Sequence, residues 1–436
     1  MKTEVLNLKN GAKLLYNRQK DVRGISINLS FLAGAFNDKK GKRGIAHFCE
    51  HALCSFPNAK MTREERASYK RKYMYFNAYT NNNRVVFEIN VTEEDFEDAI
   101  DFVTESFSSI NLCEEEFEKE KKIIEDEIKT RPKRNRNQLY YLGNTNIVKD
   151  KHYNSCSSSP AGAIETFSKI TLDDLKEFIA EYFTLNNLTV VVTGNISKKR
   201  VKNSMHKYVE TRIGTSQTQG FLAREVNDMY QPRFNFQKAD EEGKAIFACL
   251  YKLKHIPWSY EVARDWKVCG ILSPILHEYA NQFYRQKKNL CYGCSLSTGG
   301  YVNNLISEFV IECQEENLQE AIDCYNEFIT SLPKDISKED FDKHKRRRLL
   351  AYNFDFLGLG QISDIAYDVY HNENKLYDDK YRKYIVEERK NISYEEVNSM
   401  YHTIFSTKPH ISIISNDEKY KDFDYKNYVK KTQIKN

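Results

Sequence analysis

The residues best suited to chemistry lie close together near the N-terminus, where His47, Glu50 and His51 form an H-x-x-E-H pattern. No proline interrupts this stretch, so a helix is expected, and positions i, i+3 and i+4 of a helix share one face. Two neutral imidazoles one turn apart can bind the same Zn²⁺ ion at roughly 2.0–2.1 Å, while the carboxylate between them faces the ion without binding it. Zinc lowers the pKa of a bound water to about 7, and a neighbouring carboxylate can then accept its proton. The pattern predicts zinc-assisted hydrolysis, with two histidine ligands and Glu50 as the general base.

A catalytic zinc site usually takes a third protein ligand, and an acidic helix further along the sequence offers candidates. The segment EEEFEKEKKIIEDEIKTRPK contains Glu120 and Glu127, which are seven residues, or two helical turns, apart on one face. Pro132 is expected to end this helix. The segment carries several acids, so its composition alone does not select one of them.

This arrangement resembles the inverzincin peptidases of the pitrilysin type, a family that includes mitochondrial processing peptidase and insulin-degrading enzyme. The third ligand of the family is a glutamate spaced from the second histidine as Glu127 is from His51, which is 76 residues. Glu120 matches a preceding family glutamate that supports the site without binding the metal. The resemblance therefore implies Zn²⁺ as the cofactor, with His47, His51 and Glu127 as its ligands and Glu120 as a supporting catalytic residue.

Two other segments are similar to motifs of the same family. Asn77, Ala78, Tyr79 and Thr80 resemble its N-A-x-T segment, which is an edge strand that pairs with the backbone of the peptide substrate. The resemblance implies that Asn77 and Ala78 bind substrate.

In the second half of the sequence, Arg285 and Tyr292 in RQKKNLCY are similar to the family motif R-E-x-x-G-L-x-Y. In the family the arginine holds the substrate and the tyrosine stabilises the oxyanion, which is the electrostatic role that the reaction demands. Gln286 and Asn289 replace the acid and the glycine of the motif, and the segment after His152 follows the family loosely. These departures concern substrate preference more than catalysis.

The elements that must position these residues are revealed by an internal repeat with an offset of 222 residues. The segment from Ile170 aligns without gaps with the segment from Ile392, and the segment from Phe87 aligns with the one from Phe309. The first pair predicts a helix with a capping box followed by a buried strand, and the second pair predicts a strand followed by an amphipathic helix. The capping boxes pair Thr171 with Asp174 and Ser393 with Glu396.

The fold class expected from this repeat is α+β, with two homologous domains that each contain a mostly antiparallel sheet packed with helices. The predicted domains are residues 1–215 and 233–436, joined by a polar linker over residues 216–232. Adding 222 to the positions of the two histidines and the base gives Cys269, Leu272 and Ser273. The acidic helix aligns better at 224, where Glu127 corresponds to Ala351. We therefore expect a metal site in the first domain only.

Composition narrows the class of protein further. A formal net charge of +4 is too small to indicate nucleic-acid binding, and no stretch approaches the roughly 18 apolar residues of a membrane span. The N-terminus also lacks an apolar run of signal-peptide length, so a cytoplasmic location is expected. Two basic runs, Arg131 to Arg136 and Lys343 to Arg348, are able to contact phosphate or an acidic peptide, although solvated helix surface is the more common role of such runs.

The ten cysteines are scattered, which favours reduced and mostly buried thiols over a disulfide framework. Cys291 and Cys294 form a single C-x-x-C that also suits a redox pair or half of a zinc knuckle, but buried neutral thiols are the simpler interpretation. Cys49 and Cys54 are expected on the apolar face of the metal helix.

The function predicted from these residues is that of a zinc metalloendopeptidase acting on unstructured peptides or extended precursor segments. The alternatives are a dedicated maturation peptidase for a ribosomally made precursor and a non-catalytic assembly subunit of the same fold. Pitrilysin-type enzymes build a chamber from four such domains, and this protein has two. The resemblance therefore implies a homodimer or a heterodimer with a related protein, in which Arg285 and Tyr292 serve either their own zinc site or the partner's.

Overall fold

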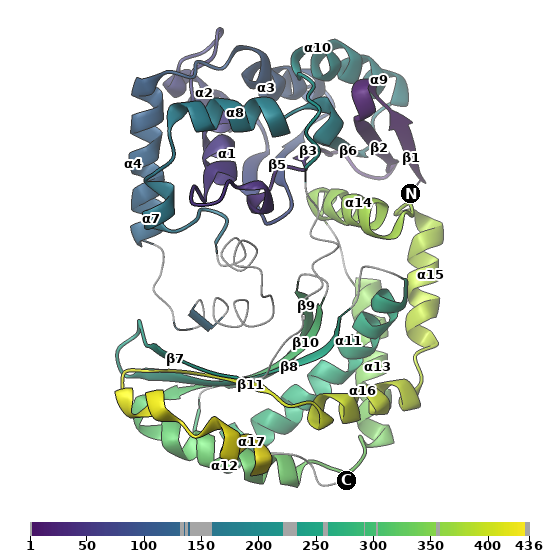
Figure 1. Ribbon diagram of the computed structural model, residues 1–436. Coiled ribbons are helices and arrows are strands. Elements are labelled where there is room, and N and C mark those ends of the chain that lie inside the picture. Colours follow the sequence, from purple (N-terminus) through teal and green to yellow (C-terminus); the bar gives the residue numbers. More distant parts are fainter. Residues whose placement is uncertain are drawn as a thin grey trace. The chain divides into compact units, whose positions relative to one another are not determined.

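The structure is a computed structural model that describes residues 2–130, 135, 138–139, 159–220, 233–255, 260–291, 293–301, 304–354 and 358–431. The protein forms two compact units, and each is made of separate stretches of sequence (Figure 1). Unit 1 comprises Met1–Arg131, Ser155–Ala223 and Phe356–Lys383, and unit 2 comprises Pro132–Asn154, Arg224–Asp355 and Tyr384–Asn436. The proposed linker over residues 216–232 stays a prediction, because most of it lies outside the described residues.

Unit 1 is built on a six-stranded sheet with the order β1-β2-β6-β3-β5-β4. Neighbouring strands are antiparallel except for the parallel pair of β2 and β6. The strands are β1 (Lys2–Asn7), β2 (Lys13–Arg18), β3 (Ile25–Phe31), β4 (Tyr75–Thr80), β5 (Val85–Val91) and β6 (Leu188–Gly194). The helices are α1 (Ile45–Ser55), α2 (Arg63–Tyr69), α3 (Phe96–Ser109), α4 (Glu114–Thr130), α7 (Ile164–Phe167), α8 (Leu172–Tyr182), α9 (Lys198–Ser204), α10 (Glu210–Arg212) and α14 (Leu359–Glu373).

The two faces of this sheet differ because successive strand residues point to opposite sides. Apolar side chains such as Leu29 of β3 and Val192 of β6 enter the core that α1, α3 and α8 cover. Many of the alternate residues, such as Ser26 and Thr193, are polar, and α14 packs on this face, with the Ser363 hydroxyl donating to the Thr193 hydroxyl at 2.8 Å. A helix from far along the sequence therefore completes unit 1 (Figure 1).

Unit 2 contains a five-stranded sheet with the order β7-β11-β8-β10-β9, in which only β7 and β11 are parallel. Its strands are β7 (Phe234–Lys238), β8 (Lys244–His255), β9 (Gly293–Tyr301), β10 (Asn304–Gln314) and β11 (His410–Ser415). Its helices are α11 (Tyr260–Ala280), α12 (Leu318–Ser331), α13 (Lys338–Phe354), α16 (Tyr394–Ser406) and α17 (Tyr425–Lys431), and α15 (Asp379–Lys390) contains the boundary between the units. No described helix is long and apolar enough to cross a membrane.

The predicted fold class is confirmed. The two sheets have the same strand order. The order β7-β11-β8-β10-β9 in unit 2 corresponds, strand by strand, to the order β2-β6-β3-β5-β4 in unit 1. Both predicted capping boxes form, with Thr171 Oγ1 accepting from the Asp174 amide and Ser393 Oγ accepting from the Glu396 amide. The internal repeat in the sequence therefore reflects a repeated topology.

The start of α1 is fixed by two local features. Gly44 has a φ of 93°, and a β-carbon added there would lie 2.2 Å from the Ala161 carbonyl oxygen, so the position requires glycine. The buried Asp38 carboxylate accepts hydrogen bonds from the backbone amides of Gly44 at 2.7 Å and Ala46 at 3.0 Å. These bonds satisfy amides that have no partner inside the helix and set its first turn. The position of the H-x-x-E-H residues follows from that turn.

Candidate metal centre

The centre is formed by two helices of unit 1, α1 and α4. Phe48 of α1 stacks on Phe117 of α4, with ring centroids 4.9 Å apart and an angle of 17° between the rings. Buried aromatic contacts of this kind contribute about 0.5–1.5 kcal/mol beyond area burial, and they hold one helix against the other. His47 and His51 lie one turn apart on α1, with ring centroids 4.5 Å apart.

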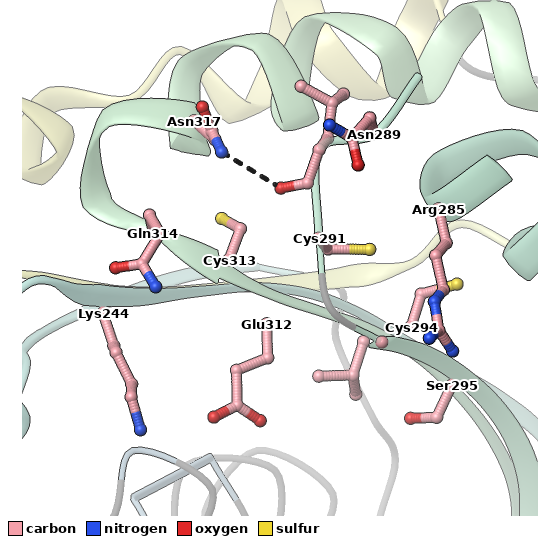
Figure 2. Close-up of a pocket in the computed structure, with 13 residues that line it drawn as sticks. Lys244, Arg285, Asn289, Cys291, Cys294, Ser295, Glu312, Cys313, Gln314 and Asn317 are labelled. Carbon is pink, nitrogen blue, oxygen red and sulfur yellow. Dashed lines mark hydrogen bonds between the residues drawn. The ribbon is translucent and has the colours of Figure 1, made fainter. Parts of the chain in front are cut away.

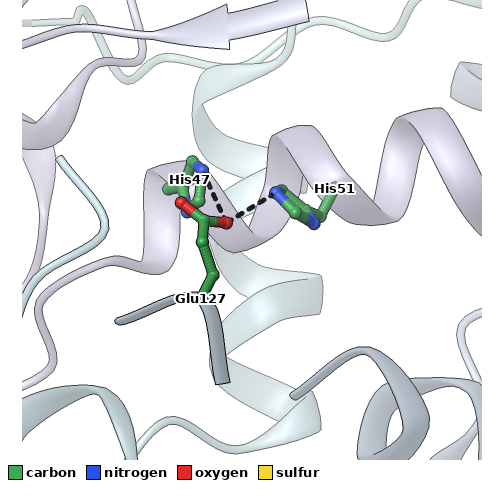
Figure 3. Close-up of side chains that lie close together, drawn as sticks. All are labelled: His47, His51 and Glu127. Atoms are coloured by element: carbon green, nitrogen blue, oxygen red, sulfur yellow. Dashed lines mark ion pairs between the residues drawn. The ribbon is translucent and has the colours of Figure 1, made fainter. Parts of the chain in front are cut away.

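Glu127 reaches from α4 to both histidines (Figure 3). Its Oε2 atom lies 4.0 Å from His47 Nε2 and 3.7 Å from His51 Nε2. Direct hydrogen bonds would shorten these distances to about 3.2 Å or less, whereas two ligands of one tetrahedral zinc ion lie about 3.4 Å apart. The spacing and the N, N, O donor set therefore fit Zn²⁺. The ligand side chains are 12% (His47), 22% (His51) and 39% (Glu127) exposed, so water and substrate have access to the site.

Glu120 orients His51 through the ring nitrogen that does not face Glu127. Glu120 Oε1 lies 2.9 Å from His51 Nδ1, which turns Nε2 of the same ring towards Glu127. Burial acts to lower the pKa of His51, but the bond to Glu120 and the surrounding carboxylates outweigh it, and the net pKa is raised. Arg63 of α2 also binds Glu120, and its Nε donates to Glu116 at 2.7 Å. The predicted supporting residue thus contacts the ligand His51 and is itself held by an arginine.

Changing Glu120 to Gln is expected to weaken zinc binding by about 10- to 100-fold, because the histidine ligand loses its anionic partner. Competition with a chromophoric chelator measures this affinity. The control is Glu118→Gln, an exposed glutamate on the same helix, which is expected to leave the affinity unchanged. Equal affinities for the two variants would contradict the role of Glu120.

Glu50 lies on α1 between the histidines and is 7% exposed. Burial raises the pKa of its carboxyl, and the hydrogen bond from Thr80 acts in the opposite direction. The Thr80 hydroxyl donates to Glu50 Oε2 at 2.6 Å. This shift brings the pKa of the carboxyl closer to the pKa of a zinc-bound water. Such a match suits a general base that takes a proton from that water. Thr80 fixes the direction in which the carboxylate points.

Changing Thr80 to Val is expected to lower kcat for peptide cleavage about tenfold or more, because a hydrogen bond to a charged group contributes about 1.5–3 kcal/mol. Zinc content and KM are expected to stay unchanged. Thr80→Ser keeps the hydroxyl and should retain most of the activity. Loss of activity in Thr80→Ser to the same extent would indicate a packing role for the residue instead.

Asn77 and Ala78 lie on β4, at the edge of the sheet of unit 1. Among the described residues, β4 pairs only with β5, with Asn77 opposite Glu88 and Ala78 opposite Phe87. Ala78 packs against the core, whereas Tyr79 points to the other face and donates from its hydroxyl to Asp364 of α14 at 2.8 Å. The free edge of β4 is available to an extended peptide. Substrate binding by Asn77 and Ala78 stays a prediction.

Arg285 belongs to unit 2, in a π-helical turn over Asn281–Lys287. Figure 2 shows it at one end of a pocket of about 810 Å³, beside Cys294 and with Cys291 nearby. Both cysteines are buried, as are Cys49 and Cys54 on α1, and the nine described cysteines are free thiols. Tyr292 lies outside the described residues, so its predicted role and its relation to Arg285 stay predictions.

Two contacts of the centre were not predicted from the sequence. Arg63, which holds Glu120, belongs to no recognised motif and comes from a helix that carries none. Thr80 is part of the N-A-x-T run, and the alternation of a strand places it on the same face as Ala78. That alternation was the available signal for Thr80, while nothing in the sequence pointed to Arg63.

Comparisons with known proteins give family matches along most of the sequence. The family model described as "Insulinase (Peptidase family M16)" matches residues 14–154, and the one described as "Peptidase M16 inactive domain" matches residues 169–348. The sequence is 23% identical to the uncharacterized zinc protease YmxG of Bacillus subtilis, over 78% of this protein and 81% of that one. It is 27% identical to the zinc protease PqqE of Helicobacter pylori, over 48% of this protein and 47% of that one.

Solved structures share the fold. A protease from Helicobacter pylori superimposes with a TM-score of 0.76 at 18% identity, over 95% of this protein and 98% of that one. The first half of the periplasmic protease PqqL from Escherichia coli gives a TM-score of 0.78 at 13% identity, over 99% and 94%. Two successive family models, relatives that are named zinc proteases and the shared fold lead to one assignment: this protein belongs to the M16 (insulinase/pitrilysin) peptidase family.

Proposed function

We propose that this protein is a zinc-dependent endopeptidase that hydrolyses unstructured peptides or extended precursor segments. The observation that carries the proposal is the convergence of His47, His51 and Glu127 at the spacing of one tetrahedral ion, with Glu50 between the histidines in sequence. These three residues would hold Zn²⁺, which when bound would supply an activated water and polarise the scissile carbonyl.

The other residues of the centre account for proton transfer and orientation. The Glu50 carboxylate accepts a proton from the attacking water and donates it to the leaving amine nitrogen, so that one water and one peptide bond yield a carboxylic acid and an amine. Thr80 keeps the carboxylate directed, and Glu120 keeps His51 in place. The free edge of β4 aligns the substrate backbone by strand addition, and this supports the proposal that the substrates are extended segments.

Cleavage of a peptide library, with and without a chelator, tests this proposal. We expect cleavage that stops when zinc is removed and returns when zinc is added. Broad cleavage supports general peptide turnover, and cleavage confined to one sequence supports the alternative of a dedicated maturation peptidase. A zinc-loaded protein that cleaves no member of a diverse library would favour the alternative of a non-catalytic subunit.

As part of the same proposal, the active form is a homodimer or a heterodimer with a related protein. Arg285, and Tyr292 by resemblance to the family, then bind the peptide and stabilise the oxyanion. Mixing protomers that carry Glu50→Gln with protomers that carry Arg285→Ala tests the homodimer: activity above that of either parent is expected if the two residues serve one substrate from different protomers. No recovery, with dimers present, would contradict this arrangement. A cytoplasmic location remains a prediction.

A further inference from the structure

Unit 2 contains a pocket at the position that corresponds to the metal centre of unit 1. Cys269 and Ser273 of α11 follow His47 and His51 by the 222-residue offset of the repeat, and His344 of α13 follows Glu120 by 224. All three of these counterparts line one pocket of about 590 Å³. The second copy of the fold therefore has a pocket at this place, lined by other side chains.

The side chains of this pocket make it positively charged. Arg347 and Arg348 line it from α13, and both are exposed. The pocket's lining carboxylate, Glu278, is already bound by Lys343 Nζ at 2.7 Å and His344 Nε2 at 2.9 Å. Within the described part of the protein, neither arginine has a hydrogen bond or an ion pair. Two guanidinium groups are thus available to a ligand.

The walls of the pocket hold the arginines beside polar and apolar groups. A β-carbon at Gly270 would lie 3.6 Å from Arg348 Nε, at ordinary van der Waals distance, so this side chain lies against α11. Ser273 Oγ accepts from the Thr298 amide at 3.1 Å, which joins α11 to β9. Trp266 and Leu296 add apolar surface. This mixture suits a peptide better than a small inorganic ion.

The pocket also borders a free strand edge. Leu296, Ser297 and Thr298 belong to β9, the last strand in the sheet order of unit 2. Among the described residues, β9 pairs only with β10. An extended peptide added to such an edge directs alternate side chains to one face of the sheet. An acidic side chain on that face would reach the guanidinium groups.

We propose that this pocket binds a carboxylate of an extended acidic peptide segment through Arg347 and Arg348, an inference that rests on the proposed peptidase function. The planar guanidinium group forms paired hydrogen bonds with a carboxylate, which is the geometry that an acidic side chain or the carboxyl terminus of a peptide offers. The residues of the basic run Lys343 to Arg348 then have two different roles. Lys343 and His344 neutralise Glu278, and the last two arginines select acidic substrates.

Fluorescence anisotropy with labelled ten-residue peptides tests the proposal. The whole protein with Glu50→Gln is used so that no cleavage occurs, and a peptide with two glutamates is compared with its glutamine counterpart. Arg347→Gln with Arg348→Gln is expected to weaken binding of the acidic peptide at least tenfold and to leave binding of the glutamine peptide unchanged. The control, Arg346→Gln with Lys338→Gln, removes the same charge from α13 outside the pocket and should change binding less than twofold.

Three outcomes would overturn the proposal: equal loss in both double variants, no preference for the acidic peptide, or displacement of that peptide by inorganic phosphate at concentrations similar to those of unlabelled acidic peptide. The last outcome would identify a phosphate site. If the arginine variant does not fold, Ser273→Asp places a repelling carboxylate in the pocket and is expected to cause the same selective loss. Because binding is measured without cleavage, failure of the peptidase proposal would appear separately, as a wild-type protein that binds acidic peptides and hydrolyses none.

Discussion

Changing Glu50 to Gln is expected to lower kcat for peptide hydrolysis about 100- to 10,000-fold while zinc remains bound. The amide keeps the shape of the side chain and its contact with the Thr80 hydroxyl, but it does not accept a proton from water. Glu50 is not one of the three residues whose ligand atoms converge. Replacing its carboxylate by an amide therefore leaves the set of metal ligands intact. Turnover and zinc content are measured on the same preparation.

The matched comparison for this variant is Thr80→Val, which removes the hydrogen bond that Glu50→Gln keeps and leaves the carboxylate. A larger loss in Glu50→Gln than in Thr80→Val separates proton transfer from orientation. Two results would contradict the assignment. Activity within a few-fold of wild type would show that another group acts as the base, and loss of zinc would show that Glu50 helps to hold the metal.

Changing His51 to Ala is expected to remove both the zinc and the activity. Two protein ligands remain after this change. Structural sites with four ligands bind Zn²⁺ with a free energy of about 10–16 kcal/mol, so each ligand contributes roughly 100-fold or more to the affinity. Glu120 also loses its histidine partner and is left buried with Arg63. Zinc content by elemental analysis and cleavage of the best library peptide measure the effect.

His206→Ala is a suitable control, because the side chain of this histidine is 68% exposed and solvent reaches its ion pair with Glu210, whose own side chain is 8% exposed. Surface pairs contribute about 0–1 kcal/mol, so stability, zinc content and activity should be close to those of wild type. Full zinc content in His51→Ala would place the metal elsewhere. Activity that survives the loss of zinc would remove the metal from the mechanism.

The parts of this molecule that could be predicted from the sequence depend on short-range patterns. His47, Glu50 and His51 lie within five residues, and the helical repeat alone places them on one face. The capping boxes at Thr171 and Ser393 are likewise local, and both formed. The common offset of the repeat linked distant segments and predicted two sheets of the same topology.

The parts that could not be predicted depend on packing between segments far apart in sequence. Nothing in the composition of α14 indicates that it packs on the polar face of the first sheet, where Asp364 accepts from Tyr79. The bond from Arg63 to Glu120 joins residues on separate helices that share no motif. Such contacts follow from how the helices dock, and the spacing of residues within one element does not encode them.

The role of unit 2 illustrates the same limit. The offset identifies Cys269 and Ser273 as the counterparts of the two histidine ligands. It gives no indication that these residues line a cationic pocket with Arg347 and Arg348. Composition predicts solvated helix surface for the whole basic run Lys343 to Arg348. Only the pocket that Arg347 and Arg348 line leads to the proposal that these two arginines bind a ligand.

The most direct test of the central claim is peptide cleavage measured against zinc occupancy, with metal-free protein titrated with zinc under conditions of tight binding. We expect activity to rise in proportion to bound zinc and to stop rising at one zinc per protomer, while Glu127→Gln binds zinc weakly and stays inactive at the same additions. The matched variant Asp126→Asn, an exposed acid next to this ligand, should follow the wild-type curve. Full cleavage by the metal-free protein, or a Glu127→Gln curve that coincides with that of wild type, would contradict the account.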